Sequence, residues 1–376
     1  MIPDAAALPQ ATALANYTIN EHFNVYAQFF DRLEKTADPG RLYYLLTAYL
    51  KIDKGLGIQI KNTQKSEVNR KLFMHLESVV TRLEDPACAA FRPRFYRVLC
   101  KILFMSYRFN LDEYIYDPQK LLFWMQLIGV VLTHPTQYPQ ALTQATKFLR
   151  PLIRNSKPEE TEADSKYLRK GKLRQRSKEE SEKMSRERNF HSEWRKAYVP
   201  KIAETLMNIV QTVAPTDGKD VQKYFGNIES CLGLLIESKD VGPRVTERLT
   251  EMFDKLFELT RMLPADVEEY TDNPSQFYER YHFPLKERAI RYSAVYIISY
   301  LLNSSQAAKI LQKLGQKLQE SAADPLTREA CYYIIVKGHS GIVRIDKDFA
   351  MCSALINNFV VVDMACASGI LKSQSM

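Results

Sequence analysis

The feature that most constrains the fold of this chain is a helical spacing of apolar residues that returns in segment after segment. Apolar side chains recur mostly at steps of three or four along residues 68–83, 121–132, 245–263 and 290–301. Residues at these steps line one face of an α-helix. We find no convincing apolar–polar alternation bounded by hairpin turns. Each segment therefore predicts an amphipathic helix that buries its apolar face against a neighbour.

Several predicted helix starts share one chemical device, an Asp or Asn directly before a proline. It occurs at Asp85, Asp117, Asn273 and Asp324. The side-chain oxygen accepts a hydrogen bond from an N–H of the first turn, and proline loses nothing at the first helical position. Glycine is also scarce, at 13 of 376 residues, and glycine costs about 1 kcal/mol in a helix interior. Both observations favour helices joined by short connections.

Together these signals predict a chain made of short helices. The predicted spans are 21–34, 41–53, 66–84, 91–108, 117–133, 137–154, 194–213, 219–237, 243–263, 274–280, 284–302, 305–321, 325–338, 347–357 and 360–372. Successive pairs start about 40 to 50 residues apart, the period of HEAT and armadillo repeats. In such repeats each helix pair buries its apolar face only against neighbouring pairs. We therefore expect an all-α fold, a HEAT/armadillo-like right-handed helical solenoid.

One polar stretch separates two groups of predicted helices. Between Lys166 and Arg188, ten Lys or Arg residues stand against four Glu, while the whole chain has a net charge of +8. This composition predicts a solvated, disordered segment whose second half has some helix-forming character. The expected organisation is a disordered tail over 1–19, HEAT-like helix pairs over 20–154, a basic disordered insert over 155–192, and further HEAT-like helix pairs over 193–372.

Residues with chemical reactivity are scattered along the chain. It has no Gly-rich phosphate loop and no HExxH or GxSxG motif, and its six histidines lie in unrelated segments. Its six cysteines lack CxxC spacing, which is typical of reduced, buried thiols. Gly338-His339-Ser340-Gly341 is interpreted as a turn between two helices. We expect no enzyme activity, no catalytic residue, no cofactor and no metal site.

Membrane insertion is not expected. The longest apolar stretches, 121–132 and 292–302, are far shorter than the ~20 residues that span a bilayer. The N-terminus lacks a basic region followed by a long apolar run, so we expect no signal peptide. These features predict a soluble intracellular protein.

A more specific motif follows the helix predicted at 243–263. An acidic stretch, an aromatic residue, an Asp/Asn-Pro step and a second aromatic residue precede an Arg- and Ala-containing helix. The residues concerned are Asp266 to Glu269, Tyr270, Asp272, Asn273, Pro274 and Phe277. This motif resembles the importin-β superfamily, or karyopherins, especially the large importins of the importin-seven and importin-eight type and the importin-α re-exporter. The family's usual tryptophan is replaced here by Tyr270, and its usual aspartate before proline by Asn273.

The resemblance extends at low identity over about residues 20–372 and implies a nuclear transport receptor or a mid-receptor segment of one. Such a protein binds Ran GTPase, cargo proteins and nucleoporin Phe-Gly repeats, and it shuttles between cytoplasm and nucleus through nuclear pores. The matched motif is expected to join repeats, so it transfers no Ran or cargo contact onto particular residues.

Two other functions remain open, both of them binding functions. The chain would be a HEAT-repeat scaffold that assembles another protein complex, or it would contact RNA through the basic insert. A partner of the insert would meet Lys166, Arg169, Lys170, Lys172, Arg174, Arg176 and Lys178.

Overall fold

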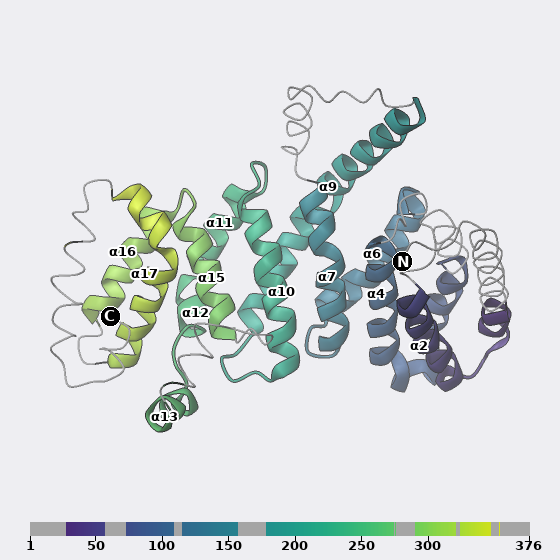
Figure 1. Ribbon diagram of the computed structural model, residues 1–376, viewed down its shortest axis with the longest axis horizontal. Coiled ribbons are helices and arrows are strands. Elements are labelled where there is room, and N and C mark those ends of the chain that lie inside the picture. The colour runs from purple at the N-terminus through teal and green to yellow at the C-terminus, as the bar shows by residue number, and fades with distance from the viewer. Residues whose placement is uncertain are drawn as a thin grey trace, which may run out of the picture. The chain divides into compact units, whose positions relative to one another are not determined.

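A computed structural model describes residues 28–56, 73–108, 115–156, 178–273, 290–320 and 324–346, with positions 275 and 353 (Figure 1). Throughout these ranges the regular structure is helical and contains no strand. The predicted all-α class is therefore confirmed. The chain divides into two compact units, residues 1–148 and 149–376.

In the first unit, helices pack in two rows. Its elements are helix 28–35, α2 (Pro39–Leu56), helix 73–82, the 3₁₀ helix η2 (Pro86–Phe91), α4 (Arg92–Arg108), α6 (Pro118–Thr133) and the first part of α7 (Pro139–Asn155). Stacking of Phe30 on His75 and an edge contact between Phe73 and Trp124 join helices 28–35, 73–82 and α6. Ring contacts from Phe95 to Tyr43 and from Tyr107 to Phe148 join α2, α4 and α7.

In the second unit, the helices also lie in two rows. After the end of α7 come α9 (Lys178–Thr212), α10 (Lys219–Ile236), α11 (Gly242–Glu251), α12 (Phe253–Glu258), α13 (Pro264–Asp272), α15 (Ile290–Leu302), α16 (Ala307–Glu320) and α17 (Pro325–Ile345). One row is α10, α15 and α17, each packed on the next (Figure 1). In the other row α9 contacts α11, and α12 is joined to α16 by the Lys317–Asp254 ion pair at 2.9 Å.

Predicted capping is confirmed at three of the four proline steps. Asp85 accepts a hydrogen bond from the N–H of Ala87, Asp117 from that of Gln119, and Asp324 from that of Leu326. The fourth residue, Asn273, ends α13, and its own N–H donates to the Glu269 carbonyl over 2.8 Å. Pro274 lies outside the described residues.

Helix α9 corrects the predicted extent of the disordered insert. The insert was expected to reach residue 192, but α9 begins at Lys178. Residues 178–189 are rich in Lys, Arg and Glu, which are good helix formers. Phe190 and Trp194 are buried four residues apart, so they fix one face of the helix by packing. Residues 157–177 lie outside the described residues, as do 1–19 and the helix expected at 360–372. Of the helices expected at 274–280 and 347–357, only positions 275 and 353 are described.

The Gly338-His339-Ser340-Gly341 sequence, predicted to be a turn, lies inside α17. A Cβ atom added at Gly341 would stand 2.2 Å from the Leu302 carbonyl oxygen at the end of α15. One added at Gly338 would stand equally close to the Leu302 side chain. The two glycines therefore allow α17 to approach α15 closely, a packing role that local turn chemistry does not reveal.

The segment predicted as one helix over 243–263 is divided. Met252 interrupts it between α11 and α12, and the backbone there has φ −83° and ψ +11°. The acidic stretch that follows forms α13, which buries no residue. The Asp266 carboxylate accepts a hydrogen bond from the Leu263 N–H over 2.9 Å and so stabilises the start of α13.

Candidate interaction groove

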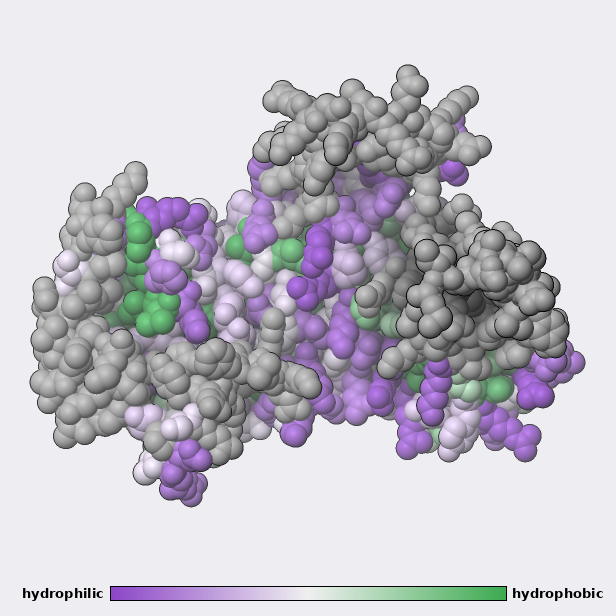
Figure 2. Space-filling view, in the orientation of Figure 1, coloured by the Kyte–Doolittle hydropathy of each residue, from purple (hydrophilic) through white to green (hydrophobic). Residues whose placement is uncertain are grey.

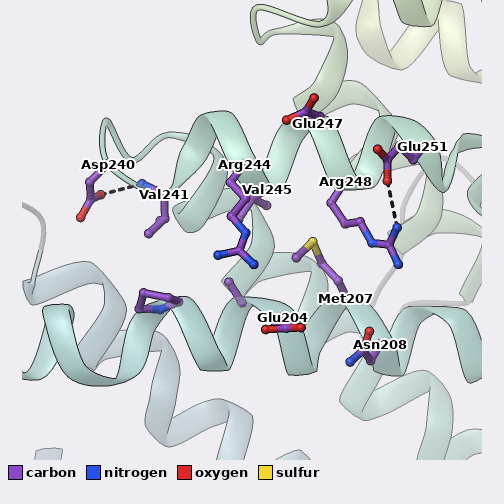
Figure 3. A pocket seen from close by; sticks show the side chains of 12 residues that line it. Glu204, Met207, Asn208, Asp240, Val241, Arg244, Val245, Glu247, Arg248 and Glu251 are labelled. Carbon is purple, nitrogen blue, oxygen red and sulfur yellow. Dashed lines mark hydrogen bonds and ion pairs between the residues drawn. The ribbon is translucent and has the colours of Figure 1, made fainter.

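A groove of about 440 Å³ lies between α9 and α11 in the second unit (Figure 3). Its floor is apolar, because Ala203 and Met207 of α9 and Val245 of α11 are buried there. Pro200 and Val241 complete the apolar lining at one end. Polar and charged residues form the walls.

Helical periodicity places the wall residues. Glu204 and Asn208 are four residues apart on α9, and Arg244 and Arg248 are four residues apart on α11. Residues at this separation lie on one face of a helix, and all four side chains are exposed. In Figure 3, Arg244 and Arg248 point toward α9, whereas Glu247 points away from the groove.

The two arginines differ in their pairing. Arg248 donates to the Glu251 carboxylate over 2.9 Å, with about half of each side chain exposed. Such exposed pairs contribute less than about 1 kcal/mol. Arg244 forms no ion pair with any of the described residues. Among the described residues, the groove therefore holds one guanidinium that forms no ion pair and one that is only weakly held.

A buried hydrogen-bond network fixes one end of the groove. Arg195 of α9 is ion-paired with Asp240, just before α11, and donates to Ser238 and to the carbonyl of Ser156 over 3.2 Å. The Arg195 guanidinium holds the pKa of Asp240 well below its usual range. Because the same guanidinium holds the end of α7 and the connection before α11, it keeps the first turn of α11 in place beside α9.

The structure places the sequence-predicted site residues away from this groove or outside the described residues. Lys166, Arg169, Lys170, Lys172, Arg174 and Arg176 lie outside them, and Lys178 is the first residue of α9. Tyr270 and Asp272 belong to α13, Asn273 ends it, and Pro274 and Phe277 lie outside the described residues. Sequence reasoning missed the groove. The spacing of four residues within α9 and within α11 was a usable signal for each wall, but α10 lies between the two helices in sequence, so the spacing does not show that the walls meet.

We also searched the described part of the chain for metal sites, reactive thiols and membrane-spanning helices. It contains no group of three or more His, Cys, Asp or Glu residues placed to hold a metal ion. Its four cysteines, Cys88, Cys100, Cys231 and Cys331, are buried, and none of them forms a disulfide. Burial raises the pKa of Cys100 and of Cys231 to about 12, so neither thiol ionises near neutral pH. None of the described helices has the length and apolarity needed to cross a bilayer.

Comparisons with known proteins identify no relative. No family model, no curated protein and no solved structure matches the chain. The residues and their geometry are therefore the basis on which a function is proposed.

Proposed function

We propose that this chain is a HEAT-type right-handed helical solenoid that binds other proteins. The observation that carries the proposal is the groove between α9 and α11, with its apolar floor and exposed charged walls. Stacked helices in two rows leave such grooves at regular intervals, and the rigid helices on either side hold them open for a partner segment. Protein binding uses this geometry directly, since an apolar floor with polar walls is the usual composition of an interface core and its rim.

We propose nuclear transport as the particular role. The support is the resemblance at 266–277, where the acidic stretch, Tyr270 and the Asn273-Pro274 step follow the order found in importin-β superfamily members. In this role the chain binds Ran GTPase, cargo proteins and nucleoporin Phe-Gly repeats, and it shuttles between cytoplasm and nucleus. The groove walls are charged, so Phe-Gly repeats would use other, more apolar faces of the stack.

A pull-down tests the transport role. The chain is immobilised and offered Ran loaded with GTP or with GDP, and then a Phe-Gly repeat peptide or a Ser-Gly control of equal length. We expect more Ran to be retained in the GTP state, and weak binding of the Phe-Gly peptide alone, because one phenylalanine buries little apolar area. Equal retention of Ran in its GTP and GDP states, together with equal retention of the Phe-Gly and Ser-Gly peptides, would contradict the transport role. A general protein-binding scaffold would then be the remaining proposal.

RNA contact through the basic insert is a second candidate function. The observation in its favour is the concentration of Lys and Arg between residues 166 and 178. Neutralising phosphates with such residues releases counterions, so binding of this kind falls steeply with salt concentration. An acidic protein surface carries the same negative charge as RNA and could also bind the insert, but it lacks the regularly repeating phosphates of a nucleic acid.

Charge neutralisation in the insert tests this second candidate. If the insert binds RNA, replacing Arg169, Lys170 and Lys172 with glutamine should weaken binding of a labelled single-stranded RNA. The slope of log affinity against log salt should fall by about 0.7 for each phosphate that the variant no longer neutralises. The matched control replaces three exposed helical lysines, Lys147, Lys196 and Lys201, with glutamine. Equal effects of the two triple variants would exclude a specific role for the insert.

A further inference from the structure

We propose that the groove between α9 and α11 binds an extended acidic segment of a partner protein. In the proposed complex, two carboxylates two residues apart contact Arg244 and Arg248, and the intervening apolar side chain lies against Met207. Figure 3 shows these three residues in the groove. The inference rests on the proposed protein-binding function and names the chemistry of the partner.

Spacing selects the form of the ligand. Arg244 and Arg248 are four residues apart, which separates them by about 6 Å along the axis of α11. In an extended chain, side chains on one edge repeat every two residues, a separation of roughly 6.5 Å. A partner sequence of the form acidic–apolar–acidic therefore presents its carboxylates at about the spacing of positions 244 and 248 along α11.

Availability of the arginines favours an anionic ligand. Arg244 is exposed and forms no ion pair with the described residues, and Arg248 has only its exposed partner Glu251. A guanidinium binds a carboxylate with two parallel hydrogen bonds, the strongest pairing open to either group. Exchanging the Glu251 contact of Arg248 for a partner carboxylate therefore costs little.

The opposite wall sets the orientation of the segment. Glu204 on α9 faces the groove across from α11 and repels a carboxylate, so the acidic edge of the segment turns toward Arg244 and Arg248. Asn208, on the same wall, has an amide that both donates and accepts hydrogen bonds and suits a peptide backbone. Met207 lies between these two residues in sequence, with a flexible side chain that adapts to different apolar partners.

The lining also favours a protein over a nucleic acid. None of the residues that line the groove is aromatic, so they offer no platform on which bases stack. Glu204 and Glu251 line the groove and would repel a phosphate backbone that runs along it. A nucleic acid carries a phosphate at every nucleotide, whereas a peptide with two carboxylates can turn both toward Arg244 and Arg248.

A second apolar surface, on α17, does not indicate the chemistry of a partner. Figure 2 shows apolar surface over α17, where Val336, Val343 and Ile345 are exposed. Nothing in the described part of the chain shows what covers these side chains. The groove therefore carries the inference.

The test uses the full chain and labelled peptides of ten residues, followed by fluorescence anisotropy. The probes contain Asp-Leu-Asp, Asn-Leu-Asn or Lys-Leu-Lys between Gly-Ser flanks, with a single-stranded oligonucleotide of equal length as a fourth probe. We expect the Asp-Leu-Asp peptide to bind at least tenfold more tightly than the asparagine and lysine peptides. Equal binding of the aspartate and asparagine peptides, or oligonucleotide binding that depends on Arg244, would overturn the proposal.

Variants assign the binding to the groove. R244E should weaken binding of the Asp-Leu-Asp peptide at least tenfold, and E204Q should tighten it by removing the repulsion. K201E, which reverses an exposed charge on α9 outside the groove lining, is the matched control and should change affinity less than twofold. If R244E lowers the melting temperature, R244Q replaces it. Unchanged binding by a folded Arg244 variant would also contradict the proposal.

The two proposals fail separately. Loss of Asp-Leu-Asp binding in the Arg244 variants reports on the groove, whereas the pull-down with Ran and Phe-Gly peptides reports on the transport role. If the chain retains Ran-GTP but binds the aspartate and asparagine peptides equally, only the proposal for the groove is contradicted. A chain that binds the aspartate peptide through Arg244 but retains neither Ran nor Phe-Gly peptide is a protein-binding scaffold of another kind.

Discussion

Replacing Glu329 with glutamine is expected to destabilise the protein by about 3–5 kcal/mol, because it removes the carboxylate that pairs with a buried guanidinium. Nη2 of Arg291 on α15 lies 2.6 Å from both carboxylate oxygens of Glu329 on α17. Arg291 is 6% exposed and Glu329 is fully buried. The guanidinium also lies 4.7 Å from the centre of the Tyr333 ring, so it is surrounded by protein. Urea denaturation, monitored by circular dichroism, measures the loss.

Two comparisons separate this pair from ordinary surface pairs. Glu251→Gln removes the partner of Arg248 in an exposed pair and should cost less than about 1 kcal/mol. The double variant Arg291→Met with Glu329→Leu removes both charges and should be more stable than Glu329→Gln, since no buried charge is left unpaired. If Glu329→Gln unfolds at the same urea concentration as Glu251→Gln, the pair does not hold α15 to α17.

Helix positions followed from the sequence because they depend on local chemistry. Asp117 and Asp324 begin helices where an acidic residue precedes proline, and the apolar stripe that contains Ile290 forms α15. These signals act within a few residues of the chain and need no knowledge of the neighbours. The class of the fold was therefore predictable.

What sequence reasoning missed depends on contacts between distant segments. Arg291 and Glu329 are 38 residues apart, and nothing near either residue marks it as buried. Gly341 looked like a turn residue because its close approach to Leu302 comes from a different helix. The groove was missed for the same reason, since Arg244 and Glu204 face one another only after α9 and α11 have packed. Sequence periodicity shows which face of a helix is buried, but it does not show which other helix packs against that face.

The second large effect is expected at Leu256, in the row formed by α12 and α16. Leu256 is fully buried in α12, which contacts α15. We expect Leu256→Asp to destabilise the protein by at least about 4 kcal/mol, because loss of a buried leucine costs about 2–5 kcal/mol and an unpaired carboxylate adds a desolvation cost. Urea denaturation measures the change, and Leu256→Ala separates the cavity contribution from that of the charge.

Glu258→Asp, at an exposed position on the same helix, is the matched control and should change stability by no more than about 0.5 kcal/mol. In a stack where each helix pair contacts only its neighbours, the damage should begin locally. Limited proteolysis of Leu256→Asp should therefore cut first near α12 and α16, which Lys317 and Asp254 join. Cleavage that begins instead in helix 28–35 or α2 would show that stability is shared across the whole chain, and it would contradict the proposed solenoid.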